Sequence, residues 1–264
     1  MEDTKIHEGA RKRRKQGVAN VLPIVRPDEI DVDEVEDQDA APIPFRCVFP
    51  DCPSGFRPSH LREAFFCGAS EVESSMLNTL TDFVNLCASG TLPVEITQVV
   101  LAATLIPFRK NSARDVSIVG VRTIASGETL RRLVAKCVLK KVQDKFKAIV
   151  TALQCGVAVP DAINSISFTM LRYYEMLVKE PQLGLMQLDL SNAFNSVDRS
   201  AILRFVCEKL PEASAWVEWV LCAAAPLYIG RQQFLCITGV QQGDLMGPLL
   251  FASGIHNAIS KRWQ

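Results

Sequence analysis

Asp189 is the residue whose type and position most suggest chemistry. It lies near the C-terminal end of the short apolar run Leu183–Leu190, and an aromatic residue, Phe194, follows five positions later. A run of this length, followed by an amphipathic segment that begins at Arg199, is typical of a β-strand that delivers an acid to a cleft. Carboxylate oxygens are the preferred ligands of hard divalent cations. The pattern therefore predicts a strand over 183–190 that ends in a metal-binding acid.

A second segment suited to chemistry, Gly239–Phe251 (GVQQGDLMGPLLF), begins fifty residues after Asp189. Its glycines, two amides and an acid are expected to form a turn before a helix, and a glycine there lets the backbone approach a substrate closely. Together with Gly184–Asp198 (GLMQLDLSNAFNSVD), this segment resembles the first two palm motifs of reverse transcriptases. The resemblance is strongest to the non-long-terminal-repeat retrotransposon type, whose motifs run D-x-S-N-A-F-N-S-V and G-V-Q-Q-G-D-P-L-G-P-L-L-F.

Four upstream segments extend the resemblance over roughly residues 50–260. They are Pro53–Ala64 (PSGFRPSHLREA), Thr104–Lys110 (TLIPFRK), Val121–Leu133 (VRTIASGETLRRL) and Leu153–Val159 (LQCGVAV). The sequence departs from the family pattern where Thr123, Leu245 and Met246 replace a proline, a proline and a leucine. The alternative is an unrelated α/β domain with chance matches.

The resemblance implies an RNA-directed DNA polymerase that uses two Mg²⁺ ions. Asp189 would bind both ions, and the backbone carbonyl of Leu190 would help to hold one of them. Phe194 would lie beneath the incoming sugar and exclude a 2′-hydroxyl. Two structural alternatives stay open, a strand-end acid that caps a neighbouring group for Asp189 and a simple core residue for Phe194.

The resemblance also assigns residues to the incoming nucleotide. Lys110 and Arg122 match the fingers cations that grip the triphosphate, and Gln242 and Gly243 match the pair that contacts nucleotide and template. The implied partners are an RNA template, a DNA primer and deoxynucleoside triphosphates. Each of the two cations can equally be a solvated surface charge. Arg131 and Arg132, which follow on an expected helix, would contact template phosphates or lie on an exposed helix face.

The third palm motif of the family, an aromatic-x-Asp-Asp hairpin, does not occur before Gln264. Asp198 and Asp244 are the nearest other acids, and neither has a hairpin context. One matching carboxylate stands where the two-metal reaction uses two or three, so this chain alone is expected not to polymerise. Two other hypotheses stay open: a non-catalytic nucleic-acid-binding remnant, and a module that recruits a partner through residues 1–44.

The expected fold class is α+β and largely helical, with right-hand polymerase fingers, a partial palm and no thumb. We expect a disordered charged arm over 1–44, a fingers-like region over 45–183 and the partial palm over 184–264. The arm contains the basic block Arg11–Lys15, which suits a nuclear-import signal, a nucleic-acid tether or plain solvated charge, and Asp28–Asp39, which has eight acids. Its charge density leaves too little apolar surface to offset the entropy of ordering.

Charge is balanced over the whole sequence, with 29 basic and 29 acidic residues. The first 40 residues hold seven of the basic and eleven of the acidic ones, which leaves 22 and 18 and a net charge of +4. A mildly basic remainder is compatible with a phosphate-binding surface. Nine cysteines without a Cys-x-x-Cys pair, no secretory signal and no apolar run of membrane-spanning length indicate a soluble intracellular protein. A zinc site at Cys47, Cys52, His60 and Cys67 has unsuitable spacing. The oligomeric state is not indicated.

Apolar periodicity and turn residues predict the main elements. Helices are expected at Ser74–Ala88, Glu128–Val150, Asp161–Lys179, Arg199–Leu210, Ser214–Ala224 and Gly247–Arg262, and a hairpin at Leu227–Thr238 that turns at Gly230.

Overall fold

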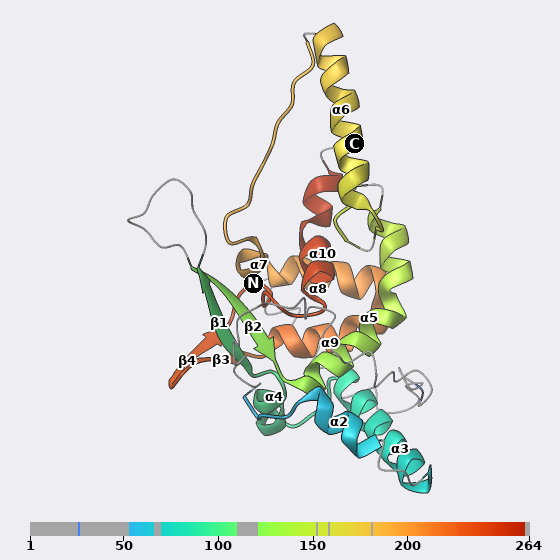
Figure 1. Ribbon diagram of the computed structural model, residues 1–264, viewed down its shortest axis with the longest axis vertical. Coiled ribbons are helices and arrows are strands. Elements are labelled where there is room, and N and C mark those ends of the chain that lie inside the picture. Colours follow the sequence, from blue (N-terminus) through green and yellow to red (C-terminus); the bar gives the residue numbers. More distant parts are fainter. Residues whose placement is uncertain are drawn as a thin grey trace.

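The computed structural model describes residue 26 and residues 53–65, 70–109, 121–151, 153–157, 159–180 and 182–261. The prediction of a disordered arm over 1–44 therefore lies almost wholly outside the described residues. The described part mixes helices with one four-stranded sheet, which agrees with the α+β expectation (Figure 1). None of its helices is long and apolar enough to cross a membrane.

The sheet has the order β2-β1-β3-β4. Its strands are β1 (Ala103–Arg109), β2 (Val121–Gly127), β3 (Ala225–Ile229) and β4 (Gln232–Cys236). Strand β1 pairs antiparallel with β2 and parallel with β3, where Ala103 lies opposite Leu227. The β3–β4 hairpin confirms the predicted one, and its turn contains Gly230 in the left-handed region at φ 57°. A glycine adopts this conformation at little steric cost.

The helices predicted from periodicity are present with small shifts at their ends. They are α3 (Ser70–Ala88), α5 (Thr129–Val150), α6 (Ala162–Lys179), α8 (Arg199–Lys209), α9 (Pro211–Cys222) and α10 (Gly247–Ser260), accompanied by the shorter α2 (Pro58–Phe65), α4 (Val94–Val100) and α7 (Ala193–Ser196). The buried positions of α5 recur at helical spacing, so one face of this helix packs into the core.

The hydrophobic core lies where α5, α8, α9 and α10 meet. Phe146 of α5 is fully buried, and its ring meets that of Phe205 of α8 edge to face at 6.2 Å between centroids. Truncating a buried Phe to Ala costs about 3–5 kcal/mol. At the start of α8, the Asp198 carboxylate accepts hydrogen bonds from the backbone N–H groups of Ser200 and Ala201. This cap fixes the chain direction directly after the first palm-like motif.

The strand predicted over 183–190 does not form, which corrects the sequence-based expectation. The segment is extended, but no backbone–backbone hydrogen bond joins residues 185–190 to any part of the chain that the structure describes. A strand needs a neighbour to satisfy its N–H and C=O groups, and the four-stranded sheet does not supply one here. The prediction of a strand over 183–190 is therefore wrong, because the described chain offers this apolar run no neighbouring strand.

Helix α6 has no buried residue. In Figure 1 it projects away from the helices around the core, and the extended segment runs back from its far end towards α7. Helix and segment together form the part of the described chain with the least internal packing.

Candidate functional site

The turn between β4 and α10, residues 239–246, lies against the end of the first palm-like motif. Gly239 has φ 59°, and a Cβ atom there would lie 2.3 Å from the backbone of Asn195. The N–H of Val240 donates to the carbonyl of Phe194 at 2.8 Å, and the hydroxyl of Thr238 donates to the carbonyl of Asn195 at 3.2 Å. The two segments that resemble palm motifs are thus in direct backbone contact.

The same turn also contacts strand β2. The carbonyl of Gln242 accepts a hydrogen bond from the N–H of Ala125 at 2.7 Å. Gly243 has φ 109°, and a Cβ atom there would lie 2.5 Å from the carbonyl oxygen of Ala125 and 2.9 Å from the side chain of Ile124. Only glycine fits a backbone approach this close. Arg122 is exposed on the strand and shares a face with Ile124, since side chains alternate along a strand.

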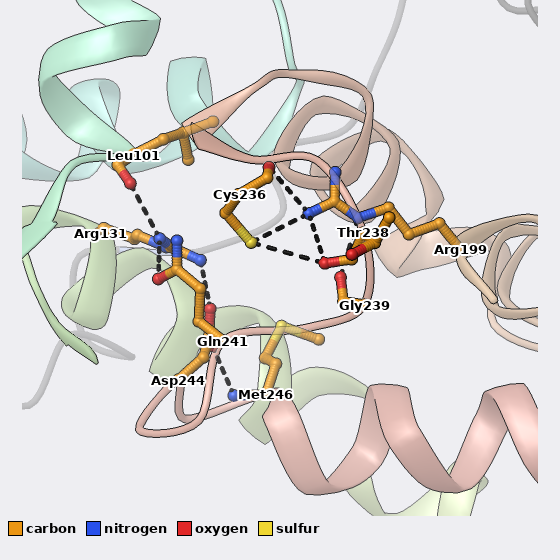
Figure 2. Close-up of polar contacts among 9 residues, drawn as sticks. All are labelled: Leu101, Arg131, Arg199, Cys236, Thr238, Gly239, Gln241, Asp244 and Met246. Atoms are coloured by element: carbon orange, nitrogen blue, oxygen red, sulfur yellow. Dashed lines mark hydrogen bonds and ion pairs between the residues drawn. The ribbon is translucent and has the colours of Figure 1, made fainter. Parts of the chain in front are cut away.

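Arg131 of α5 binds the turn from its buried side (Figure 2). The side chain is 4% exposed, and Nη1 donates to Oε1 of Gln241 at 2.8 Å and to the carbonyl of Leu101 at 3.1 Å. Nη2 forms an ion pair with the Asp244 carboxylate, which is also largely buried. Neither sequence-based expectation for Arg131 holds, because the side chain is on no exposed face and its donors point at the turn. Removing one partner of a buried pair costs about 3–5 kcal/mol because the other charge is left unpaired.

Arg199 at the start of α8 holds the other end of the turn (Figure 2). Its Nε donates to the carbonyl of Gly239 at 2.8 Å, and its Nη1 donates to the carbonyl of Leu221 at 2.7 Å. Nη2 lies 3.2 Å from the carbonyl of Cys236. Burial lowers the pKa of Arg199 from its ordinary value, but a guanidinium stays charged in proteins. No sequence pattern indicates this role of Arg199, because the acceptors are backbone carbonyls far along the chain.

Phe194 faces helix α10. Its ring stacks on Phe251 with 5.1 Å between centroids and 13° between planes, and a Cβ atom at Gly247 would lie 3.3 Å from it. Phe194 is half-buried. The packing agrees with the core interpretation of this residue, and contact with an incoming sugar stays a prediction.

Asp189 and Leu190 are exposed, and Asp189 makes no hydrogen bond or ion pair with any residue the structure describes. The other two acids of the region are engaged, since Asp198 caps α8 and Asp244 pairs with Arg131. Within the described ranges, no three His, Cys, Asp or Glu side chains gather into a group that could hold a metal ion. The described residues therefore do not make a complete two-magnesium site, and no reaction step is assigned to a metal ion. Lys110 lies outside the described residues.

Two cavities flank the sheet. The smaller, about 230 Å³, is lined by Thr123, Asn195, Thr238 and Gln242 and lies at the turn. The larger cavity, about 670 Å³, is lined by Thr104 and Tyr228, whereas their sequence neighbours Leu105 and Leu227 line the smaller one. Because successive side chains of a strand point to opposite faces of the sheet, the two cavities lie on opposite faces. The buried Glu128 of the larger cavity accepts hydrogen bonds from the backbone N–H and the hydroxyl of Ser54 at 2.8 and 2.6 Å.

The Ser54–Glu128 contact also joins two of the upstream motifs. Thr129, which follows Glu128, donates its hydroxyl to the carbonyl of Phe56, so the segment PSGFRP is fastened to the start of α5. Of the predicted nucleotide-binding residues, the structure brings Arg122, Gln242 and Gly243 to adjoining segments. Phe194 is joined to the same turn by the hydrogen bond from the N–H of Val240 to its carbonyl. The structure leaves Asp189 on the unpaired segment. A comparison of the sequence with protein-family models and with curated proteins found no match.

Proposed function

We propose that the chain forms the fingers and the first part of the palm of a polymerase domain related to the reverse transcriptases of non-long-terminal-repeat retrotransposons. The observation that carries this proposal is the convergence of three motifs on one turn. The turn is bonded to Phe194 through Val240 and to Ala125 through Gln242. Segments that resemble the family in sequence, and that lie far apart along the chain, thus meet at one turn, which supports the proposal.

The residues at the turn suit the recognition of a nucleoside triphosphate and a template. Arg122 is exposed, and a guanidinium can pair with two phosphate oxygens at once. Gly243 is exposed and has no side chain, so a ligand can approach the backbone of the turn closely at this residue. Gln242 is half-buried beside the smaller cavity, where its amide can donate and accept. In this proposal these residues select the nucleotide, and Lys110 adds a second cation.

Polymerisation itself requires more carboxylates than Asp189. In the proposed function the chain holds the template and the incoming nucleotide, and the remaining acids belong to a complementary palm segment with an Asp-Asp hairpin. The carboxylate count equally favours a second candidate, a nucleic-acid-binding protein without catalysis. Its affinity would fall steeply with salt, as expected when basic side chains displace the counterions bound to the phosphates of a nucleic acid.

Primer extension separates the two candidates. The 264-residue chain is assayed on an RNA template with a DNA primer and Mg²⁺ or Mn²⁺, alone and fused to a palm half with the Asp-Asp hairpin and a thumb. We expect no extension by the chain alone, extension by the fusion, and loss of extension in the fusion with Asp189→Ala. A folded fusion that binds the template–primer but does not extend it would favour the binding protein. Extension by the chain alone, abolished by Asp189→Ala, would overturn the carboxylate argument.

A further inference from the structure

Helix α6 and the extended segment 184–190 both carry exposed apolar side chains. Ile163 and Val178, near opposite ends of the helix, are 81% and 84% exposed, and Leu188 of the segment is 72% exposed. Further exposed apolar side chains on the two elements are Ile166, Phe168, Leu171, Tyr174, Met176, Leu185, Met186 and Leu190. The Tyr173 hydroxyl donates to the carbonyl of Gly184 at 2.8 Å and ties the helix to the segment. Exposed apolar patches of this extent mark interaction sites.

The conformation of the segment's backbone indicates what kind of partner it can bind. Residues 185–190 are extended and make no backbone–backbone hydrogen bond with the described part of the chain. Extended unpaired backbone is a template for the addition of a strand. Because side chains alternate along a strand, Met186, Leu188 and Leu190 share one face of residues 186–190, whereas Gln187 and Asp189 share the other, which Leu185 continues at the N-terminal end. The partner must therefore be another strand with the same alternation.

We propose that the partner is a second copy of this chain, and that residues 186–190 of the two copies pair antiparallel about a two-fold axis at Leu188. In this register Leu188 lies opposite Leu188 of the second copy, and Met186 lies opposite Leu190. On the other face, Gln187 lies opposite Asp189 twice, so that an amide can donate to each carboxylate. No like charges face each other. A shift by one residue would place apolar side chains opposite polar ones.

The segment is thus complementary to itself in one register, which an isologous dimer requires. Since each α6 is tied to its own segment through Tyr173, the pairing brings both helices to the same interface. The exposed apolar side chains of both elements are then removed from water together, which favours association. Asp189 stays on the polar face of the pair. The proposal does not depend on the proposed polymerase function.

Sedimentation of the full chain tests the association. We expect a concentration-dependent species of twice the 29.2 kDa chain mass. Leu188→Asp places two carboxylates opposite each other on the axis, and it should weaken dimerisation about 100-fold or more because two apolar contacts are also lost. Val94→Asp on α4 is the matched control, because Val94 is 64% exposed outside this surface, and it should leave the dimer unchanged. Circular dichroism checks that both variants fold.

Cross-linking tests the register without removing an apolar side chain. The variants Gln187→Cys and Asp189→Cys are oxidised separately and as a mixture, and the linked peptides are identified by mass spectrometry against the unsubstituted chain. We expect the disulfide between positions 187 and 189 in the mixture, well above any disulfide formed by either variant alone. Efficient links within each separate variant would indicate parallel pairing and overturn the proposal. A monomer at every concentration would also overturn the proposal and would mean that a different polypeptide covers the surface. A dimer that persists with Leu188→Asp would overturn it as well, because the contact would then lie elsewhere.

Discussion

The turn at residues 239–246 and the segment at 184–190 both lie in stretches that resemble palm motifs, but they are built in opposite ways. The turn is bonded at its two ends by the buried Arg131 and the half-buried Arg199, packed on β2 and fixed by two glycines in the left-handed region. The segment has an exposed backbone and exposed leucines. The difference teaches that contacts within the described chain fix the turn in place, whereas no backbone hydrogen bond to the described residues fixes the segment that carries Asp189.

Amide hydrogen exchange gives the largest expected contrast between the two regions. Below the concentration of association, the N–H of Val240, bonded to Phe194, should exchange about a thousand-fold or more slowly than those of residues 185–190, because core amides open only with global unfolding. Mass spectrometry of peptides from the two regions measures the contrast. Similar fast exchange in both would mean that the turn is not fixed by its bonds. Slowing in 185–190 with rising concentration would sharpen the comparison by locating the association there.

Removing the cation beneath the turn should be the most damaging single substitution. Arg131→Ala leaves the Asp244 carboxylate buried without its partner and is expected to lower the free energy of unfolding by about 3–5 kcal/mol in urea denaturation. Lys145→Ala is the control, since it removes an exposed ion pair with Glu212 and should cost about 1 kcal/mol or less. Replacing both partners, with Arg131→Met and Asp244→Leu, should recover much of the loss. Equal small effects of Arg131→Ala and Lys145→Ala would contradict the network.

Replacing a glycine by alanine in each region should give a smaller difference in stability. Gly239→Ala forces a Cβ atom into the backbone of Asn195 and a left-handed φ on alanine, at a cost of roughly 2–3 kcal/mol. At Gly184 a Cβ atom would meet nothing within 4 Å, so Gly184→Ala should be close to neutral. Thermal denaturation of the two variants measures the difference. If Gly184→Ala is the more destabilising of the two, the contrast drawn between turn and segment is wrong.

The smallest expected effect is a pH dependence of stability that comes from His256 on α10, the helix that follows the turn. Burial lowers the pKa of His256 on α10 below its ordinary value. The unfolded chain therefore takes up this proton first as the pH falls. The contribution of His256 to the free energy of unfolding is therefore fully present above the ordinary pKa of histidine and is lost as the pH drops below that value. The melting temperature of the natural chain should fall from pH 7 to pH 5 slightly more than that of His256→Gln, and an identical slope would refute the assignment.

Individual residues show how far sequence reasoning reached into the site. Gly243 was expected to let the backbone approach a substrate closely, and the close approach that the structure shows there is to the backbone of Ala125. Arg131 was identified as part of a motif but given the wrong surroundings, since its helix position does not reveal that Gln241 and Asp244 fold back over it. Arg199 was missed, because its partners are carbonyls that no side-chain pattern encodes.

The sequence by itself determined the elements that depend on local order: the apolar periodicity of α5, α6 and α8–α10, and the glycine turn of the β3–β4 hairpin. These follow from backbone preferences and the spacing of side chains within about twenty residues. Tertiary structure alone decided which segments meet at the turn, which charges are buried together, and that 183–190 stays unpaired. A strand is stable only beside another strand, and the identity of that neighbour is not written in its own alternation of side chains.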